Sequence, residues 1–327
     1  MVIGIEKGMR SRKYADAARK MDIPYVLIDC TRNNAIKKIK KVDAFIWHWT
    51  QDKYADKRIA PSIIKCAEIM GKIVYPNTNT CWMFDDKVAE KYLLEAINAP
   101  LIDTFMFYDE LSAMKWLEKQ KYPIVYKLPQ GAGSINVRLI HNYEEGKKVC
   151  KSHFDALKNP ALAMRLHDAA KKDYLNILIT STKDSKILYG VNNKGSILFQ
   201  KYLPDNQYDV RVTVIGEKSI IFRRFVRDND FRASGSGKID YNVTEQDLQA
   251  IPIAQEVAKK INSQSMAFDF LYDNEKNLKI NEISYGFDAK AVFAAGGWYD
   301  EHLCFHKDSV DIHEEVLKSI KEMFEEK

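Results

Sequence analysis

The chain has 327 residues, of which 46% are hydrophobic and 29% are charged. This composition excludes a disordered chain, and the length predicts two or three packed lobes with a cleft between them. Lys and Arg total 50 against 45 Asp and Glu, and the small excess is spread along the chain. The charge therefore gives no reason to expect nucleic acid as a partner, although a mildly basic cleft would suit a small polyanion.

The cysteines and the apolar segments bear on the compartment. The five cysteines form no CxxC pair and are odd in number, which favours a reducing environment. The first residues lack the apolar core of a signal peptide, and no later segment is long enough to span a membrane. We therefore expect a cytoplasmic protein without membrane insertion.

Residues 1–80 alternate between apolar runs and amphipathic helical patterns. A strand pattern at 2–5 is followed by a helical one at 10–20. The alternation then continues through further apolar runs at 25–28, 44–47 and 73–75. This order predicts a small parallel-sheet α/β domain.

Residues 81–200 are predicted to form a linker helix and a lid. Asp85 begins a helical pattern that Pro100 ends. A charged helical insertion is predicted at 143–173. The strands of the lid are predicted at 102–108, 124–127, 136–140, 175–179, 187–189 and 197–199.

Residues 201–327 are predicted to form a core lobe that carries a metal site. One helix is expected at 244–261. The strands are expected at 210–215, 219–225, 266–272 and 278–283. The whole chain is thus predicted to be α/β, with α+β character in its later part.

The first candidate site follows an apolar strand that ends in Lys127. A lysine at this place can hold phosphate charge, and the loop after it contains Gly131, Gly133 and Ser134. Glycines let backbone N–H groups approach phosphate oxygens, and the serine adds a hydroxyl donor. Taken alone, such a glycine turn more often only joins two strands, and its spacing matches neither the Walker nor the dinucleotide pattern.

The second candidate lies where the chain leaves the lid for the core lobe. The backbone of this segment could contact an adenine edge, and it comprises Gln200, Lys201, Tyr202 and Leu203. Asp209, a few residues later, is placed for a ribose hydroxyl or for pairing with a lysine. A solvated acid at the start of a strand is an equally good interpretation of Asp209.

The third candidate is an arginine-rich stretch that favours binding of an oxyanion. Arg223 and Arg224 alternate across a strand, so only one of them can face a cleft. We expect Arg224 to point inward and Arg223 to be solvated. The loop that follows contains Arg232 and Ser234 among small residues.

The fourth candidate pairs Asp269 with Glu282 on two neighbouring predicted strands. A carboxylate inside an apolar strand needs a cation or a salt bridge, and Mg²⁺ prefers oxygen ligands. This pair predicts a magnesium site.

Two further motifs carry weaker interpretations. The run His302, Cys304, His306 lacks a fourth zinc ligand, and on a predicted helix the cysteine would face away from both histidines. The run Trp47, His48, Trp49 would line a substrate pocket or, more commonly for such residues, belong to the packing.

Taken in order, these features resemble the ATP-grasp superfamily, and the region from Gln200 to Ser234 is similar to the ribosomal-protein glutamate ligases. The resemblance covers about residues 75–290 and implies an N-terminal Rossmann-like pre-ATP-grasp domain, a lid and a C-terminal core lobe. It further implies that Lys87 and Lys127 contact nucleotide phosphates. By the same resemblance, residues 200–203 would contact adenine and Asp209 would face the ribose. Arg232 and Ser234 would contact the triphosphate and the acceptor, and Asp269 and Glu282 would bind Mg²⁺.

The third metal ligand departs from the family pattern. Where the glutamate ligases carry Asn two residues after the metal-binding Glu, this chain has Ser284, while Asn281 comes directly before Glu282. Both residues stay open as the third ligand.

The resemblance implies an ATP-dependent ligase that joins a carboxylate and an amine through an acyl phosphate, releasing ADP and phosphate. Two Mg²⁺ ions are expected, with Mn²⁺ as a substitute, and Arg224 is expected to stabilise the oxyanion. Similarity to a bacterial subgroup points to polysaccharide biosynthesis and to a sugar acid or an amino acid conjugate as the carboxylate. A small-molecule kinase and a non-catalytic nucleotide-binding module are the alternatives, and a homodimer formed through the first domain is expected by analogy.

Overall fold

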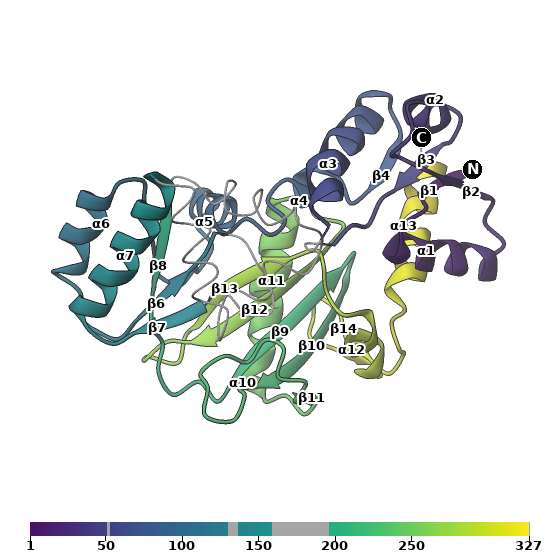
Figure 1. Cartoon of the computed structure of the whole chain (residues 1–327). Coiled ribbons are helices and arrows are strands. Elements are labelled where there is room, and N and C mark those ends of the chain that lie inside the picture. The colour runs from purple at the N-terminus through teal and green to yellow at the C-terminus, as the bar shows by residue number, and fades with distance from the viewer. Residues whose placement is uncertain (51–52, 130–136, 159–195, 327) are drawn as a thin grey trace.

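The structure is a computed structural model, and it describes residues 1–50, 53–129, 137–158 and 196–326. Three β-sheets organise these residues into an N-terminal domain, a lid and a core lobe (Figure 1). Among the described helices, none is both long and apolar enough to cross a membrane.

The N-terminal sheet has four parallel strands in the order β2-β1-β3-β4. They confirm the expected alternation: β1 is Ile3–Glu6, β2 Tyr25–Ile28, β3 Ala44–Ile46 and β4 Ile73–Tyr75. The helices between them are α1, Met9–Lys20, α2, Ala35–Ile39, and α3, Tyr54–Ile69. Because the chain leaves β1 toward β2 and later returns to the other side of β1 as β3, the order reverses between β1 and β3.

The last helix completes this first domain. Helix α13, Ile312–Glu325, packs against α1, and its Val316 and Leu317 join the buried core of Ile3 and Ile5. Figure 1 shows this helix beside the N-terminal strands, far from the lid. We expected residues 201–327 to form one lobe, but the amphipathic face of α13 is buried on the N-terminal domain.

Strand β2 forms an exposed edge of the first sheet. Its Val26 and Leu27 are 44% and 46% exposed. This is the domain through which we expect a homodimer, and that association stays a prediction.

The lid contains four antiparallel strands in the order β5-β8-β6-β7. These are β5, Thr104–Phe107, β6, Ile124–Lys127, β7, Val137–Ile140, and β8, Ile197–Lys201. Helices α6, Glu110–Leu117, and α7, Tyr143–Lys158, cover one face and share a buried core with the sheet. The rest of the predicted insertion and the predicted strands at 175–179 and 187–189 lie outside the described residues.

The core lobe is built on a seven-stranded sheet whose main path is β13-β12-β9-β10-β14-β15, with β11 pairing β10. Its long strands are β9, Tyr208–Ile215, β10, Lys218–Phe225, β12, Ser265–Tyr272, and β13, Leu278–Ser284. The short strands are β11, Ile239–Asp240, β14, Trp298–Tyr299, and β15, Phe305–His306. The long strands confirm the predicted core sheet.

Two predicted helices of this lobe differ in the structure. The helix expected at 244–261 is divided into α10, Glu245–Leu248, and α11, Ala250–Lys260. Pro252 lies in the first turn of α11, where its missing N–H is tolerated, so a new helix starts there. Residues 302–306 form a turn and strand β15 instead of a helix, and His306 is bonded to Asp300.

Two helices lead from the N-terminal sheet to the lid, and a third follows β13 within the core lobe. Helix α4 is Thr78–Cys81, α5 is Lys87–Ala96, and α12 is Ala289–Ala294. Asp86 caps α5 by accepting hydrogen bonds from Val88 and Ala89. Because α5 also packs against β13, its first turn lies beside the strand that carries Glu282.

Candidate active site between the lid and core sheets

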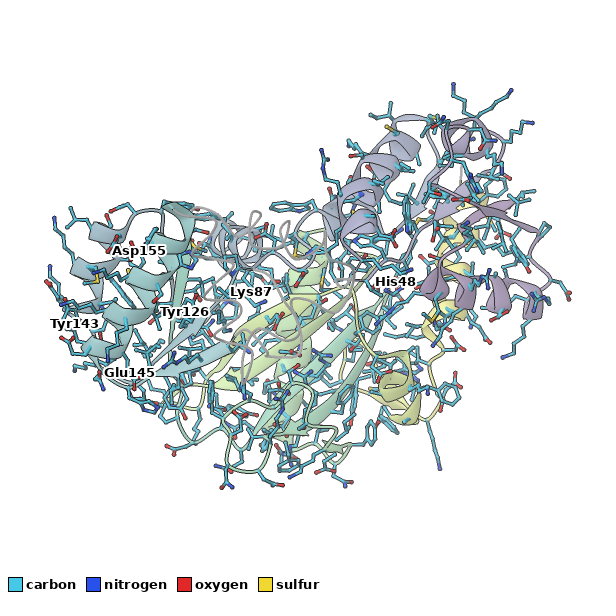
Figure 2. The ribbon with its side chains drawn as sticks, in the orientation of Figure 1. His48, Lys87, Tyr126, Tyr143, Glu145 and Asp155 are labelled. Atoms are coloured by element: carbon cyan, nitrogen blue, oxygen red, sulfur yellow. The ribbon has the colours of Figure 1, made fainter. Side chains whose placement is uncertain are left out.

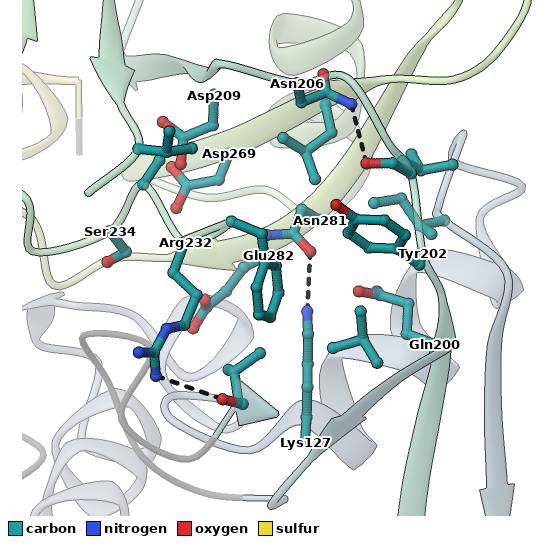
Figure 3. A pocket seen from close by; sticks show the side chains of 18 of the residues that line it. Lys127, Gln200, Tyr202, Asn206, Asp209, Arg232, Ser234, Asp269, Asn281 and Glu282 are labelled. Atoms are coloured by element: carbon teal, nitrogen blue, oxygen red, sulfur yellow. Dashed lines mark hydrogen bonds between the residues drawn. The ribbon is translucent and has the colours of Figure 1, made fainter. Parts of the chain in front are cut away.

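A cavity lies between the lid sheet and the core sheet. It holds about 740 Å³ of space free of protein atoms, part of which is open to solvent. The lid contributes Val125, Lys127 and Gln200, and the core lobe contributes Asp269 and Glu282 (Figure 3). The sequence-predicted residues from the two halves of the chain therefore meet in one place.

Lys127 links the two sheets. It is the last residue of β6, and its Nζ donates a hydrogen bond of 2.8 Å to Oδ1 of Asn281 on β13 (Figure 3). The residue is 6% exposed, and burial lowers the pKa of Lys127 to about 8. A buried ammonium group whose hydrogen-bond acceptor is a neutral amide is well placed to receive an anionic ligand.

A second lysine approaches the same strand from α5. The Nζ of Lys87, labelled in Figure 2, lies 3.6 Å from Oε1 of Glu282. Burial opposes the charge of Lys87, but Glu282 and Glu90 raise the pKa of this lysine above its usual value. The two lysines that the family resemblance assigns to phosphate contacts thus both lie near Glu282, whose charge favours the protonated form of each.

Glu90 is a residue of this site that the sequence analysis missed. It lies one turn after Lys87 and is 5% exposed, and its Oε2 accepts a 3.3 Å hydrogen bond from the backbone N of Ile283. Burial, followed by the charge of Glu282, raises the pKa of Glu90 well above its usual range. A buried polar position on the inner face of an amphipathic helix is the signal that could have identified it.

Two carboxylates and two guanidinium groups form a network across β12, β9 and β10. Asp269 accepts hydrogen bonds from Nε and Nη2 of Arg211, at 2.6 and 2.7 Å, and pairs with Nη2 of Arg224 at 2.6 Å. Arg224 also binds Asp209 through Nε, at 2.8 Å, and Nη2, at 2.5 Å. The strand register explains the network, because Asp269 lies opposite Arg211, and Asp209 opposite Arg224.

The network holds both carboxylates in defined positions. Burial would raise the pKa of Asp269, but Arg211 and Arg224 lower it to about 2. Asp209 is affected mainly by burial, which raises its pKa to about 6. The paired guanidinium groups therefore keep Asp269 ionised beside the cavity.

The predictions for the arginine pair are partly confirmed. Arg224 points inward as expected, but its guanidinium is bound by carboxylates, and it is not among the residues that line the cavity. Arg223 was expected to be solvated, and this is wrong: its side chain is 13% exposed and pairs with the buried Asp247. The acid of helix α10 supplies the partner that the alternation pattern could not reveal.

Asp209 was predicted to contact ribose or a lysine. It lines the cavity, but its partner is Arg224, so pairing with a lysine and the solvated interpretation are both wrong. Its role toward ribose stays a prediction.

Asp269 and Glu282 are direct cross-strand neighbours, and both line the cavity. The Glu282 side chain is 31% exposed, so its carboxylate is accessible from the cavity. Among the described residues, no three His, Cys, Asp or Glu side chains gather as a complete metal site. The two acids fit Mg²⁺ provided that phosphate oxygens and water complete the oxygen shell.

The structure separates the two candidates for a third metal ligand. Ser284 does not line the cavity, and its Oγ exchanges hydrogen bonds with the backbone of Gly286, at 3.1 and 3.3 Å. Asn281 lines the cavity, and its Oδ1 already accepts a hydrogen bond from Lys127. Asn281 is the better placed of the two for a metal.

The segment predicted to contact adenine forms another wall of the cavity, with Gln200, Lys201, Tyr202 and Leu203 all lining it. Asn206, which was not predicted, stabilises the turn after these residues. Its side-chain amide donates hydrogen bonds of 3.3 Å to the Leu203 carbonyl and 2.9 Å to the Tyr272 carbonyl. Figure 3 shows Gln200 and Tyr202 on the side of the cavity toward the lid strands.

The loop after β10 closes the cavity opposite this wall. Arg232 and Ser234 both line the cavity, as the resemblance implies. The guanidinium of Arg232 is hydrogen-bonded to the carboxylate of Asp230. It also donates a hydrogen bond of 3.4 Å to the carbonyl of Val137 in the lid (Figure 3). The predicted loop residues Gly131, Gly133 and Ser134 lie outside the described residues.

No protein-family model matches the chain. The α-aminoadipate–LysW ligase LysX of Saccharolobus solfataricus is 21% identical over 220 residues, which are 66% of this chain and 68% of that protein. D-cycloserine synthetase DcsG has a similar fold, with a TM-score of 0.62 and 10% identity across 99% of this chain and 100% of the other. An ATP-grasp RimK domain protein of Sphaerobacter thermophilus has a TM-score of 0.58 and 12% identity, and the match covers 98% of this chain and 99% of that protein. These similarities confirm that the fold is that of ATP-grasp proteins.

Proposed function

We propose that this chain, which has the ATP-grasp fold, is an ATP-dependent carboxylate–amine ligase. The observation that carries the proposal is the meeting of Lys127, from the lid, with Asp269 and Glu282, from the core sheet, in one cavity. Cationic and metal-binding groups from two lobes are what a bound triphosphate requires on its two sides.

ATP would lie with its base against the segment from Gln200 to Leu203. Backbone groups and the buried side-chain amide of Gln200 form that wall. This amide donates a hydrogen bond of 3.1 Å to the hydroxyl of Thr104. The phosphates would extend toward Lys127, Lys87 and Arg232, whose positive charges match them. Asp209 lies on the core-sheet side of the cavity and would face the ribose.

Asp269, Glu282 and Asn281 are the residues that would hold Mg²⁺, which neutralises charge on the phosphoryl group in transfer. Arg211 and Arg224 fix both oxygens of Asp269. We assign Arg224 a positioning role toward Asp269, because its guanidinium already holds two carboxylates. Arg232 faces the cavity and is the better candidate for contact with the acyl phosphate.

The reaction would proceed in two steps. An oxygen of the substrate carboxylate attacks the terminal phosphorus of ATP, and ADP leaves. A neutral amine then attacks the carbonyl carbon of the acyl phosphate, phosphate leaves, and the nitrogen loses a proton to form the amide. Lys127, Lys87 and Arg232 stabilise the negative charge that moves between these groups.

The finer substrate assignment is a carboxylate from a sugar acid or an amino acid conjugate, used in bacterial polysaccharide biosynthesis. It is supported only by the subgroup resemblance of the sequence motifs. The name of LysX points to an amino acid as a substrate of that relative.

Product analysis tests the proposal. The protein is incubated with ATP, Mg²⁺ and a panel of sugar acids, amino acids and amines, and the products are identified by mass spectrometry. ADP, phosphate and a condensation product lighter by one water support the ligase. ADP with a phosphorylated hydroxyl supports a kinase, and nucleotide binding without turnover on the whole panel supports a non-catalytic module.

A further inference from the structure

A second cavity lies in the N-terminal domain. It holds about 860 Å³ of space free of protein atoms, part of it open to solvent. The residues after β1 and after β3 line it, together with the start of α3: Glu6, Gly8, Met9, Arg10, His48, Trp49, Thr50, Lys53 and Asp56. The cavity therefore lies at the carboxyl ends of β1 and β3, where the strand order reverses and where open α/β sheets bind ligands.

Buried acid forms the inner part of this cavity. Glu6 is 6% exposed, and its Oε2 accepts a 2.6 Å hydrogen bond from the backbone N of Gly8. Within the described part of the chain, its Oε1 accepts no hydrogen bond. Asp56, whose side chain is 21% exposed, lies near enough to raise the pKa of Glu6, after the larger effect of burial.

The glycine after Glu6 makes room for this carboxylate. A Cβ at Gly8 would lie 2.5 Å from Oε2 of Glu6 and would displace it. The hydrogen bond from Gly8, the residue before α1, accounts for one carboxylate oxygen, and the same side chain lines a cavity with a second acid. A buried carboxylate oxygen requires a donor, and an ammonium group carries three N–H donors.

The outer part of the cavity is basic. Arg10, in the first turn of α1, is exposed and forms no ion pair with any described residue. The Lys53 side chain is half exposed, and its Nζ lies 3.9 Å from Oδ2 of Asp56. The twelve-residue helix α1 has no acidic residue in its first turn, so its N-terminus adds partial positive charge. This rim suits a carboxylate.

His48 and Trp49 pack against the residue that directly follows β13. The rings of both residues lie 5.4 Å from that of Tyr285, which follows Glu282 by three residues. His48 is 4% exposed, and its Nε2 is buried without a hydrogen-bond partner. His48 and Trp49 line this cavity, while Trp47 and Trp49 both belong to the buried core, as the packing interpretation expects. A substrate role of this motif stays a prediction.

We propose that this second cavity binds a zwitterionic amino acid, with its ammonium group against Glu6 and Asp56 and its carboxylate toward Arg10 and the start of α1. The inference rests on the proposed function, since it names the substrate class that the N-terminal domain presents to the ATP site. Among the described residues no third acid or histidine joins Glu6 and Asp56 as a metal site, which favours an ammonium ligand.

The test measures ligand binding to the full chain by thermal shift and calorimetry. Glycine and both enantiomers of every other proteinogenic amino acid are added one at a time, with ADP and Mg²⁺ present. The amino acid that binds is compared with its decarboxylated amine and its deaminated acid. We expect both truncated probes to bind at least about tenfold more weakly, because each loses one charged contact.

Variants locate the binding. Glu6→Gln and Asp56→Asn are each expected to weaken amino acid binding about tenfold and to leave ADP binding unchanged. Asp16→Asn is the control, because Asp16 lies on α1 of the same domain, does not line the cavity and has a side chain that is 71% exposed. Unchanged ADP binding also shows that each variant is folded.

The outcomes separate this inference from the proposed function. If ADP binds and no amino acid does, or if Glu6→Gln and Asp56→Asn bind the amino acid like the wild type, the inference is wrong and the nucleotide site stands. If neither ADP nor any amino acid binds, the proposed function fails together with the inference.

Discussion

Two groups of charges lie side by side at the active site, and they differ in how fully they are paired. In the core sheet, Asp269 and Arg224 belong to a network of short, bidentate ion pairs. On the lid side, Lys127 is bonded to a neutral amide, and Lys87 lies 3.6 Å from Glu282. The first group satisfies its own charges, whereas the hydrogen bond of Lys127 goes to a neutral acceptor.

The difference separates support from binding. Buried charges that are fully paired contribute a fixed geometry, because breaking one pair leaves an uncompensated charge. A buried charge whose hydrogen-bond partner is neutral gains more from an added ligand of opposite sign. We infer that the network positions Asp269 and that Lys127, Lys87 and Glu282 contact the nucleotide and its metal.

The largest expected effect comes from removing a member of the network. Arg224→Met leaves Asp209 buried without its cation, and the free energy of unfolding should fall by about 3–5 kcal/mol. Chemical denaturation of the variant and the wild type measures this free energy. Arg58→Met, at an exposed position, is the control. A loss below about 1 kcal/mol would mean that the network is not a structural support.

Removal of the accessible acid should lower activity far more than stability. Glu282→Ala is expected to lower turnover at least about a hundredfold, because the metal-bound phosphate loses a ligand. ADP release and thermal melting are followed together. Glu217→Ala, an exposed acid in the turn between β9 and β10, is the matched control. Normal turnover in Glu282→Ala would remove the metal assignment.

A smaller effect is expected at the lid lysine. Lys127→Ala should weaken ATP binding about tenfold or more, because a buried phosphate contact is lost. Calorimetry with a non-hydrolysable analogue measures the affinity, and the exposed Lys119→Ala serves as control. Unchanged affinity in Lys127→Ala would contradict the phosphate site.

The smallest effect is a dependence of ATP affinity on pH. Burial lowers the pKa of Lys127 to about 8, so the side chain is positively charged below that pH and loses its proton above it. ATP affinity should therefore fall by less than about tenfold between about pH 7 and about pH 9. In Lys127→Arg, which stays charged, affinity should be flat over this range, and an equal decline would exclude Lys127 as the cause.

Much of the fold followed from local patterns. The alternation of apolar runs located β1 to β4, and the apolar segments around Asp269 and Glu282 located β12 and β13. The packing of α13 on the first domain could not be predicted this way, because an amphipathic helix does not specify which sheet covers its apolar face. The divided helix around Gln249 was missed for a similar reason, since Pro252 is compatible with a first turn.

The sequence predicted which residues form the site, but it did not predict their hydrogen-bond and ion-pair partners. Lys127, Asp269 and Glu282 do line one cavity. The partners of Asp269 depend on the register of three strands, which places Arg211 directly opposite it. Glu90 was missed because its neighbours across the site come from β13, far along the chain.

The most direct test of the central claim follows oxygen from the carboxylate substrate. The carboxylate that supports ADP release is labelled with oxygen-18 and incubated with ATP, Mg²⁺ and the amine, and the released phosphate is analysed by mass spectrometry. An acyl phosphate intermediate transfers one labelled oxygen to phosphate, and this is the predicted result. Condensation product together with unlabelled phosphate would contradict the ligase mechanism.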